Sequence, residues 1–503
     1  MPRPRTRTAA VDLSRACDVP HAFKTTTPAF NYTRLEKMVP MRDGVKLFTL
    51  IAIPKDAPGP MPVVLTRTPY GAAGRASRTA SPDVAMALPP VDEDLVRDGY
   101  IRVYQDVRGR FRSKGRYIMT MPTRGPFNRG RVDQVTDAWD TVDWLVQNVP
   151  GNSGRVGITG VSYDGFLTLM ALLDPHPALK AAVPVNAMVD CWIGDDFYRH
   201  GALRTVMLEY VYRQTASRNA SHGIPWGYHD FYNAVLEAGS VGQLGRRYGA
   251  DRLPAWNRLL DHPAYDAYWQ DQAVQQRLAK APRKVPVLTV HSLFDQEDIY
   301  GPVLSHAALA ERDRTGRRTH LAIGPWCHGQ MTGDGSELGS MKWGADTSLQ
   351  FRTQMLTPFW DHHLKGVKPA EPLPPVLAFE TGTNQWRTCG AWPPRDETEP
   401  ARLYLQPGGG LAFAAPGADS PSCTEYVSDP AKPVPYRVPM PDANHTFLPG
   451  HRILVQVQSS WFPVYDRNPQ TFVPNIFFAK PADYRKAVQR IYRDSFVELP
   501  VVK

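Results

Sequence analysis

The sequence lacks the usual signs of a membrane protein, a disulfide-rich protein and a cofactor enzyme. No run of about 18 apolar residues occurs, so we expect no membrane-spanning helix and no membrane partner. The five cysteines are an odd number and include no C-x-x-C pair, which argues against a disulfide framework and a zinc site. The sequence also lacks an H-E-x-x-H motif, a Walker A loop and a G-x-G-x-x-G fingerprint. We therefore expect no metal, nucleotide or dinucleotide cofactor.

The first twenty residues are basic but lack the apolar stretch of a secretory signal. The chain as written therefore predicts a cytoplasmic protein, with a periplasmic location as the alternative if a leader is missing.

The net charge is +9, and basic residues gather between Arg108 and Arg131. No recognition helix or aromatic platform accompanies them, so the sequence favours solvated arginines or internal Arg–carboxylate pairs. Nucleic acid is not an expected partner.

The length of 503 residues and the 42% hydrophobic content predict a globular chain of two or three domains. Between about residues 44 and 330, β-branched runs alternate with helical patterns, as in an α/β fold around a mostly parallel sheet. The clearest helix is Gln134–Val146, with apolar residues at helical spacing. The expected strands are Val45–Ile53, Val63–Thr66, Tyr100–Asp106, Arg155–Thr159, Ala181–Val185, Val285–His291 and His320–Ile323.

Two further regions interrupt or follow this pattern. Residues 190–283 are rich in aromatic helical sequence and too long for a loop, which predicts an inserted helical cap. A helix near Leu349–Leu364 precedes a Pro- and Gly-rich region with short strands at Val376–Phe379, Leu403–Leu405 and Ile453–Val457. That region, residues 368–503, predicts a separate β-sandwich.

The most informative motif is Gly160-Val161-Ser162-Tyr163-Asp164-Gly165, which lies between an apolar strand and an apolar helix. It resembles the nucleophile elbow, in which a sharp turn exposes a serine beside backbone N–H groups. The usual form is G-x-S-x-G, whereas here Asp164 stands at the second glycine position. An ordinary βα turn is the alternative, so partners are needed to favour a catalytic serine.

Suitable partners follow in the order typical of α/β-hydrolases. Asp295 lies just after the strand that ends at His291, and His328 lies after the strand His320–Ile323. A serine nucleophile needs a histidine base, and the histidine needs a carboxylate that fixes its tautomer. The sequence therefore predicts Ser162, His328 and Asp295 as a catalytic triad.

Several segments together resemble the α-amino acid ester hydrolases, relatives of the cocaine esterase and X-Pro dipeptidyl peptidase group. They are the elbow GRVGITGVSYDGF, TRTPYG, DVRGRF, TDAWDTVDWLVQNVPGNSGRVG, WIGDDF, LFDQED, GPWCHG and ANHTFLPGHRILVQVQSSWFPVYDRNPQ, and they cover nearly the whole chain. The resemblance implies an α/β-hydrolase sheet with an inserted helical cap and a C-terminal jelly-roll-like β-domain.

The resemblance also implies roles for residues outside the triad. The oxyanion hole falls on the Tyr70 hydroxyl and the Tyr163 N–H; from the residues alone, Tyr70 also fits a core tyrosine. A carboxylate cluster falls on Asp196, Glu297 and Asp298, where it would hold the α-ammonium of the substrate. Crowded carboxylates repel one another, and a bound cation relieves that repulsion. Without the resemblance, the acidic loops also fit solvated faces or helix caps.

The expected domain bounds are an N-terminal arm at 1–35, the hydrolase domain at 36–189 and 284–367, the cap at 190–283 and the β-domain at 368–503. The resemblance implies a homotetramer that associates through the arm. It also implies a shortened β-domain, because two segments that lie far apart in family members nearly touch around residues 435–444. Missing strands would expose sheet edges.

These features predict a serine hydrolase that cleaves α-amino esters through an acyl-enzyme, with water or an amine such as a β-lactam nucleus as acceptor. Three alternatives remain open: an X-Pro dipeptidyl-peptidase-like aminopeptidase, a general carboxylesterase, and an inert binding protein. The expected ligands are small α-amino esters or amides.

Overall fold

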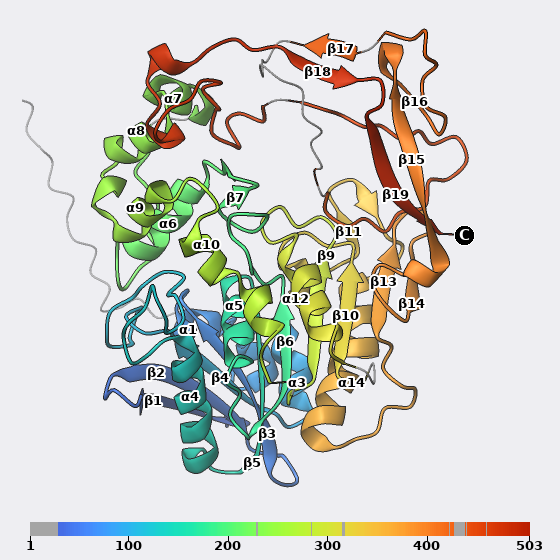
Figure 1. The fold of residues 1–503 in the computed structure, drawn as a ribbon. Helices are drawn as coiled ribbons and strands as arrows, with labels where there is room; N and C mark the ends of the chain where they lie inside the picture. The colour runs from blue at the N-terminus through green and yellow to red at the C-terminus, as the bar shows by residue number, and fades with distance from the viewer. Residues whose placement is uncertain are drawn as a thin grey trace, which may run out of the picture.

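The computed structural model describes residues 29–502 except 228–229, 283, 314–316, 422, 427–437, 439 and 459. Most of the predicted N-terminal arm, residues 1–28, lies outside the described residues. A ten-stranded sheet forms the centre of the lower body in Figure 1.

The strands of this sheet follow the order β1-β2-β4-β3-β5-β6-β9-β10-β13-β14. The pairs from β4 through β13 are parallel, and the outer strands β1, β2 and β14 are antiparallel to their neighbours. The expected α/β class is therefore confirmed. The bounds are β1 Tyr32–Pro40, β2 Lys46–Pro54, β3 Met61–Thr68, β4 Ile101–Asp106, β5 Asn152–Val161, β6 Leu179–Val185, β9 Val287–Ser292, β10 Thr319–Gly324, β13 Val376–Glu380 and β14 Gln385–Cys389.

Helices cover both faces of the sheet, because parallel strands are apolar on both sides. The predicted helix in the segment before β5 is α4, Gln134–Asn148, which begins with a capping box between Asp133 and Thr136. The other helices of this body are α1 Ala72–Arg75, α2 Val84–Ala87, α3 Glu93–Arg97, α5 Tyr163–Ala171, α12 Gly301–Ala310, α13 Thr347–Phe351 and α14 Thr357–Trp360.

The segment predicted as a cap is mostly helical where it is described. It begins with the short hairpin β7 Tyr198–Arg199 and β8 Ala202–Leu203. Its helices are α6 Met207–Thr215, α7 Phe231–Ala238, α8 Val241–Arg247, α9 Pro254–Asp261, α10 Ala267–Gln272 and α11 Val274–Leu278.

The structure corrects the start of the expected β-domain. Val376–Glu380 does form a strand, β13, but it lies parallel to β10 in the main sheet, and β14 follows it there. The five residues of β13 are all buried, so this strand belongs to the hydrolase core. The region expected as a separate sandwich therefore begins after β14.

Beyond β14, the described residues contain two small sheets, seen at the upper right of Figure 1. One joins β16 Gly410–Ala412, β15 Thr398–Gln406 and β19 Phe496–Val502, and the other joins β17 Cys423–Tyr426 and β18 Gln489–Tyr492. The strand expected at Leu403–Leu405 is part of β15, whereas Ile453–Val457 is irregular and that prediction was wrong. Part of the junction near residues 435–444 lies outside the described residues.

The chain between these sheets returns to the helical segment, where it lies beside α7 and α8 (Figure 1). The backbone N–H of Thr205 donates to the carbonyl of Val464 at 2.9 Å, and Asn475 Nδ2 donates to the carbonyl of Leu260 at 2.7 Å. Phe477 is 0% exposed and packs near the ring of Tyr198. The C-terminal region therefore braces the helices above the sheet.

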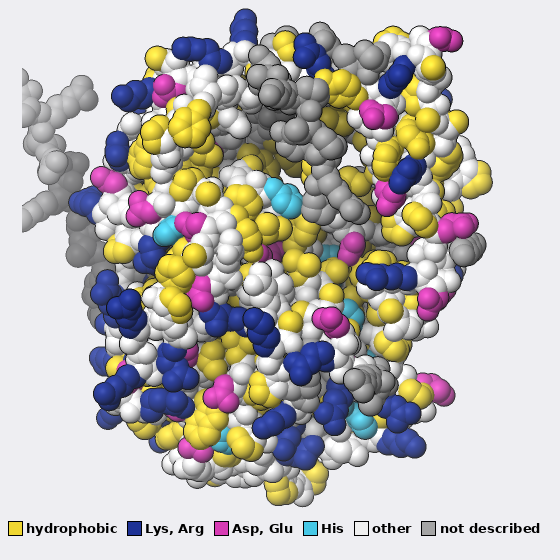
Figure 2. Space-filling model, in the orientation of Figure 1, with side chains coloured by type: hydrophobic (Ala, Val, Ile, Leu, Met, Phe, Trp, Pro, Cys, Tyr) yellow, Lys and Arg dark blue, Asp and Glu magenta, His cyan; other side chains and the backbone are white. Residues whose placement is uncertain are grey.

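Basic side chains gather over the lower part of the face in Figure 2. The arginines of the basic segment are partly neutralised inside the protein: Arg108 lies 2.6 Å from Asp137 and 2.7 Å from Asp43. This agrees with the internal pairs expected from the sequence. Among the described residues, no helix is long and apolar enough to cross a membrane.

Candidate active site

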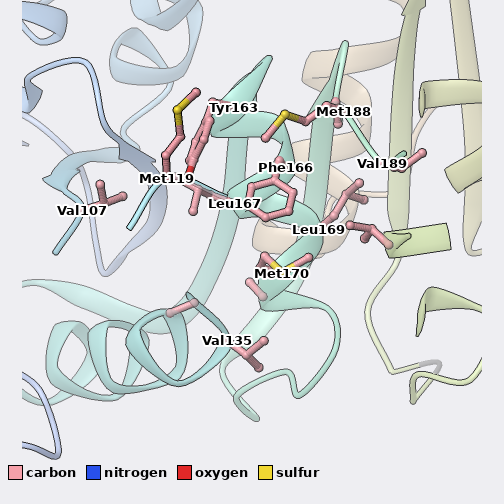
Figure 3. Packing of buried hydrophobic residues seen from close by; sticks show 14 of the residues in the cluster. Val107, Met119, Val135, Tyr163, Phe166, Leu167, Leu169, Met170, Met188 and Val189 are labelled. Atoms are coloured by element: carbon pink, nitrogen blue, oxygen red, sulfur yellow. The ribbon is translucent and has the colours of Figure 1, made fainter. Parts of the chain in front are cut away.

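Ser162 stands at the turn between β5 and α5, with φ 63° and ψ −125°. A left-handed φ is uncommon for a residue with a Cβ and marks stored backbone strain. The helix that follows the turn, α5, is buried along its whole length against core residues such as Val135 and Met188 (Figure 3). This packing holds the turn in place. Ser162 is itself 7% exposed. The predicted elbow geometry is present.

The two glycines of the motif are required by close backbone approaches. A Cβ on Gly160 would lie 2.3 Å from the Cβ of Asp164, and one on Gly165 would lie 2.7 Å from the Val185 carbonyl. The turn therefore accepts a side chain at position 164 while it needs glycine at position 165. This explains the displaced second glycine of the motif.

Asp295 and His328 meet at the carboxyl ends of β9 and β10. His328 Nδ1 lies 2.9 and 3.0 Å from the two carboxylate oxygens of Asp295. Burial alone would raise the pKa of Asp295, but the hydrogen bond with His328 and two loop N–H groups bring it below its usual value. Burial alone would lower the pKa of His328, but the Asp295 hydrogen bond raises it. This is the pairing that a general base needs.

The serine is directed to a different partner. Ser162 Oγ lies 3.4 Å from Asp298 Oδ2, and His328 Nε2 lies 3.6 Å from Glu297 Oε2. Within the described part of the chain, no hydrogen bond joins Ser162 to His328. The structure thus places the three predicted triad residues in one site and forms one of the two expected hydrogen bonds.

Backbone contacts join the two acidic loops. Asp195 and Asp298 form an antiparallel bridge, and the Asp196 N–H donates to the Glu297 carbonyl at 3.2 Å. Arg199 donates from Nη2 to the same carbonyl at 2.7 Å. The predicted cluster of Asp196, Glu297 and Asp298 is therefore assembled on a fixed backbone.

Two of these three carboxylates are buried, at Asp196 and Asp298, whereas the Glu297 side chain is 32% exposed. Burial and the neighbouring Glu297 raise the pKa of Asp196 to about 7. Burial and Asp196 raise the pKa of Asp298 well above its usual range. Asp196 Oδ2 and Asp298 Oδ1 are buried without a hydrogen-bond partner among the described residues. The cluster therefore favours a proton or a bound cation.

The adjacent aspartates 195 and 196 have different environments. The Asp195 carboxylate accepts backbone hydrogen bonds from Val189, Asp190, Tyr300 and Gly301, at 2.8 to 3.2 Å. Asp196 adopts φ 44°, and burial and the neighbouring Glu297 carboxylate raise its pKa. Asp195 therefore holds the loop in place. Asp196 keeps a carboxylate oxygen that can accept a hydrogen bond from a ligand.

Tyr163 and Tyr70 are the residues predicted for the oxyanion hole. Tyr163 is the first residue of α5, so its N–H has no acceptor within the helix. Its ring points into the core, where its hydroxyl accepts from the Thr120 N–H at 2.7 Å. Tyr70 is half-buried at the end of β3, and its hydroxyl lies 3.0 Å from that of Tyr210 in α6.

Sequence reasoning did not find Tyr210, Arg199 or Arg204 as residues of the site. Arg204 donates to the Asp196 carbonyl at 2.8 Å, so it holds the acidic loop from the helical segment. The aromatic composition of residues 190–283 was the available signal for Tyr210, but nothing in it singled out one tyrosine. Among the described residues, no group of His, Cys, Asp and Glu side chains could hold a metal ion.

Comparison with known proteins places the chain in a family. The chain matches the X-Pro dipeptidyl-peptidase family (S15 family) over residues 43–330, more than half of its length. The chain belongs to this family.

A cocaine esterase from a Rhodococcus species is 31% identical over 420 residues, which cover 79% of this chain and 68% of the esterase. The structure of an α-amino acid ester hydrolase aligns with a TM-score of 0.87 and 40% identity, covering 94% of this chain and 97% of that one. An aminopeptidase from a marine sediment thaumarchaeote aligns with a TM-score of 0.88 and 39% identity, covering 95% and 97%.

These comparisons confirm the resemblance drawn from the sequence motifs. They also confirm the expected enzyme class, because the family includes carboxylic ester hydrolases of the serine type.

Proposed function

We propose that this protein hydrolyses esters of α-amino acids, with Ser162 as nucleophile, His328 as general base and Asp295 as the group that orients the base. The observation that carries the proposal is the contact between the elbow and the acidic loops. Ser162 Oγ lies 3.4 Å from Asp298, a fully buried member of the carboxylate cluster. A substrate whose ammonium neutralises this cluster would have its ester carbonyl, two bonds away, beside the serine.

In the proposed reaction the ammonium binds among Asp196, Glu297 and Asp298. Ser162 then turns about its Cα–Cβ bond from Asp298 toward His328, since hydrogen bonds of an empty site often tighten only on binding. Ser162 Oγ attacks the ester carbonyl as His328 Nε2 takes its proton. The Tyr163 N–H and the Tyr70 hydroxyl stabilise the oxyanion. The tetrahedral intermediate collapses to an acyl-enzyme as the C–O bond breaks, and His328 gives its proton to the leaving oxygen, which departs as the alcohol.

Water activated by His328 then releases the amino acid. An amine, such as that of a β-lactam nucleus, intercepts the same acyl-enzyme to give acyl transfer. Helices α6–α11 act as a cap in this proposal, because Tyr210 of α6 contacts Tyr70 and Arg204 holds the Asp196 loop.

The test compares two esters in one variant. In Asp196→Asn, kcat/KM for phenylglycine methyl ester should fall about 100-fold, while that for p-nitrophenyl acetate, which carries no ammonium, should change less than about 3-fold. Asp195→Asn is unsuitable as a control because Asp195 fixes the loop; the surface variant Asp334→Asn serves instead. Equal losses on both esters would show that the cluster has only a structural role.

An X-Pro dipeptidyl-peptidase-like aminopeptidase is the second candidate. The family match and the aligned aminopeptidase favour it, since such enzymes also bind a substrate ammonium. Faster turnover of an Ala-Pro anilide than of the amino ester would select this function. Similar rates for plain and amino esters would instead indicate a general carboxylesterase.

The oligomeric state remains part of the proposal. The resemblance implies a homotetramer, and light scattering on the purified full chain would measure its mass. A monomeric mass would contradict it.

A further inference from the structure

Asp164 is a buried carboxylate without a role in the reaction described above. It follows Tyr163 directly and is 1% exposed. Its Oδ1 has no hydrogen-bond partner among the described residues, and its Oδ2 lies 3.8 Å from Arg75 Nη2. A buried carboxylate with so few partners costs stability, so a role in the site would account for its presence.

Arg75 links this carboxylate to the other side of the site. It is the last residue of α1, which follows the turn that carries Tyr70. Its guanidinium lies 4.8 Å from the centre of the Tyr70 ring, within the range of a cation–π contact. One guanidinium therefore contacts both the ring of Tyr70 and the residue that follows Tyr163.

Thr68 provides a second connection. The Tyr70 N–H donates to Thr68 Oγ1 at 3.1 Å. Burial raises the pKa of Asp164 to about 7, while the Arg75 charge and a hydrogen bond with Thr68 oppose that rise. Burial and the Asp164 carboxylate in turn raise the pKa of Tyr70 well above its usual value, which keeps its hydroxyl protonated. Asp164 is thus connected to Tyr70 through two residues, Arg75 and Thr68.

We propose that the Arg75–Asp164 pair positions the two donors of the oxyanion hole, the Tyr70 hydroxyl and the Tyr163 N–H, relative to each other. The donors come from separate parts of the chain, the end of β3 and the start of α5. Donors to an oxyanion act only at hydrogen-bond distance from the developing charge, so their mutual position must be held. The pair joins the Tyr70 turn to the first turn of α5. Both residues are positioning residues, because neither is assigned a contact with the substrate.

This inference rests on the proposed serine-hydrolase function. Its effect should appear in kcat and leave KM nearly unchanged, because the oxyanion forms after the substrate binds. A displaced donor commonly costs roughly 10- to 100-fold in rate. The affinity for a boronic acid, which forms an oxyanion-like adduct with Ser162, should fall in parallel with kcat.

The experiment uses the full chain and p-nitrophenyl acetate, which does not depend on the ammonium site. Arg75→Met and Asp164→Asn should each lower kcat about 10- to 100-fold with KM within about 2-fold. The double variant should lose no more kcat than the more impaired of the two single variants, because the two residues act as one unit. The matched control is Arg112→Met, since Arg112 also lies over a ring, 3.7 Å from the centre of Phe48, and pairs with Glu36 at 2.8 Å. This control should retain wild-type kcat.

The decisive comparison repeats Arg75→Met in a Tyr70→Phe background. Once the Tyr70 hydroxyl is absent, the added loss should shrink to less than about 3-fold, because the main donor that the pair positions is gone. An equal loss in both backgrounds, or an effect on KM alone, would overturn the inference. Arg75 is 40% exposed, so its variant tests the inference even if Asp164→Asn fails to fold.

A failure of the proposed function has a different signature. A wild-type chain that hydrolyses neither ester and does not react with a fluorophosphonate would contradict the proposed function, and the inference with it. An active wild type whose kcat is insensitive to Arg75→Met would overturn the inference alone.

Discussion

The carboxyl ends of the central strands of the main sheet and the C-terminal region beyond β14 are built in different ways. At the carboxyl ends of these strands, Ser162, Asp295 and Asp298 are each less than 10% exposed, and an antiparallel bridge joins the Asp298 loop to the Asp195 loop. The C-terminal region carries small sheets and exposed apolar side chains, with Leu454 at 87% and Phe472 at 97% exposure. The candidate catalytic residues and the buried carboxylates therefore lie at the main sheet, while the C-terminal region contributes contacts to the helices above it.

The strongest way to test this division is to remove the nucleophile. Ser162→Ala should lower kcat for the amino ester by roughly 10⁴- to 10⁶-fold, because the acyl-enzyme cannot form. Its melting temperature should match or exceed that of the wild type, since the strained turn keeps its geometry and loses a buried hydroxyl. Burst kinetics and calorimetry measure the two effects. Appreciable turnover would reject Ser162 as nucleophile.

The C-terminal region should show the opposite behaviour. Phe477→Ala removes a fully buried ring near Tyr198, and we expect a loss of about 3–5 kcal/mol in the free energy of unfolding. At a temperature where the variant is folded, its kcat should stay within about 3-fold of wild type. Denaturant unfolding and single-substrate kinetics check this. A large loss of kcat in the folded variant would mean that the C-terminal region takes part in catalysis.

The acidic cluster should lower stability as the pH rises. Asp196 has a folded pKa of about 7 against an ordinary value near 3.9, so the folded protein binds the proton more tightly. Its contribution is fully present below the ordinary pKa and is lost as the pH rises to about 7. The free energy of unfolding of Asp196→Asn, relative to that of the wild type, should therefore rise by roughly 1–3 kcal/mol from pH 4 to pH 8. Urea unfolding measures this difference. Parallel pH curves for the two proteins would show that Asp196 titrates normally.

The smallest effect is expected at an exposed position of the same C-terminal segment. Phe472→Ser should change the free energy of unfolding by less than about 0.5 kcal/mol and leave kcat unchanged. Together with Phe477→Ala, it distinguishes buried from exposed aromatic rings five residues apart. A destabilisation similar to that of Phe477→Ala would show that this surface is covered in solution.

The sequence was sufficient to predict the central sheet and the elbow. Apolar runs bounded by turn residues mark strands buried on both faces, and the motif around Ser162 carries its own backbone constraint through Gly160 and Gly165. Strand β1 was not predicted, because it is an edge strand whose charged residues face solvent and hide the alternation. The placement of β13 in the main sheet was missed for another reason: pairing with β10 is a tertiary choice that its five residues do not encode.

The sequence predicted the residues of the candidate site better than it predicted the contacts that they make. Asp195 and Asp196 are the same residue type at adjacent positions, and only the loop backbone directs one to N–H groups and the other to the cluster. The orientation of Ser162 toward Asp298 likewise depends on how two distant loops meet. The role of Arg75 was not visible in the sequence, because Tyr70 and Asp164 are far apart along the chain and come together only in the folded protein.

The most direct test of the account is active-site titration of the full chain with a fluorophosphonate, followed by peptide mass spectrometry, with Ser162→Ala as the blank. We expect one label per chain on Ser162 and none on the blank, with a labelling rate that falls sharply in His328→Ala. Absence of labelling, or labelling at another residue, would contradict a serine nucleophile at this elbow.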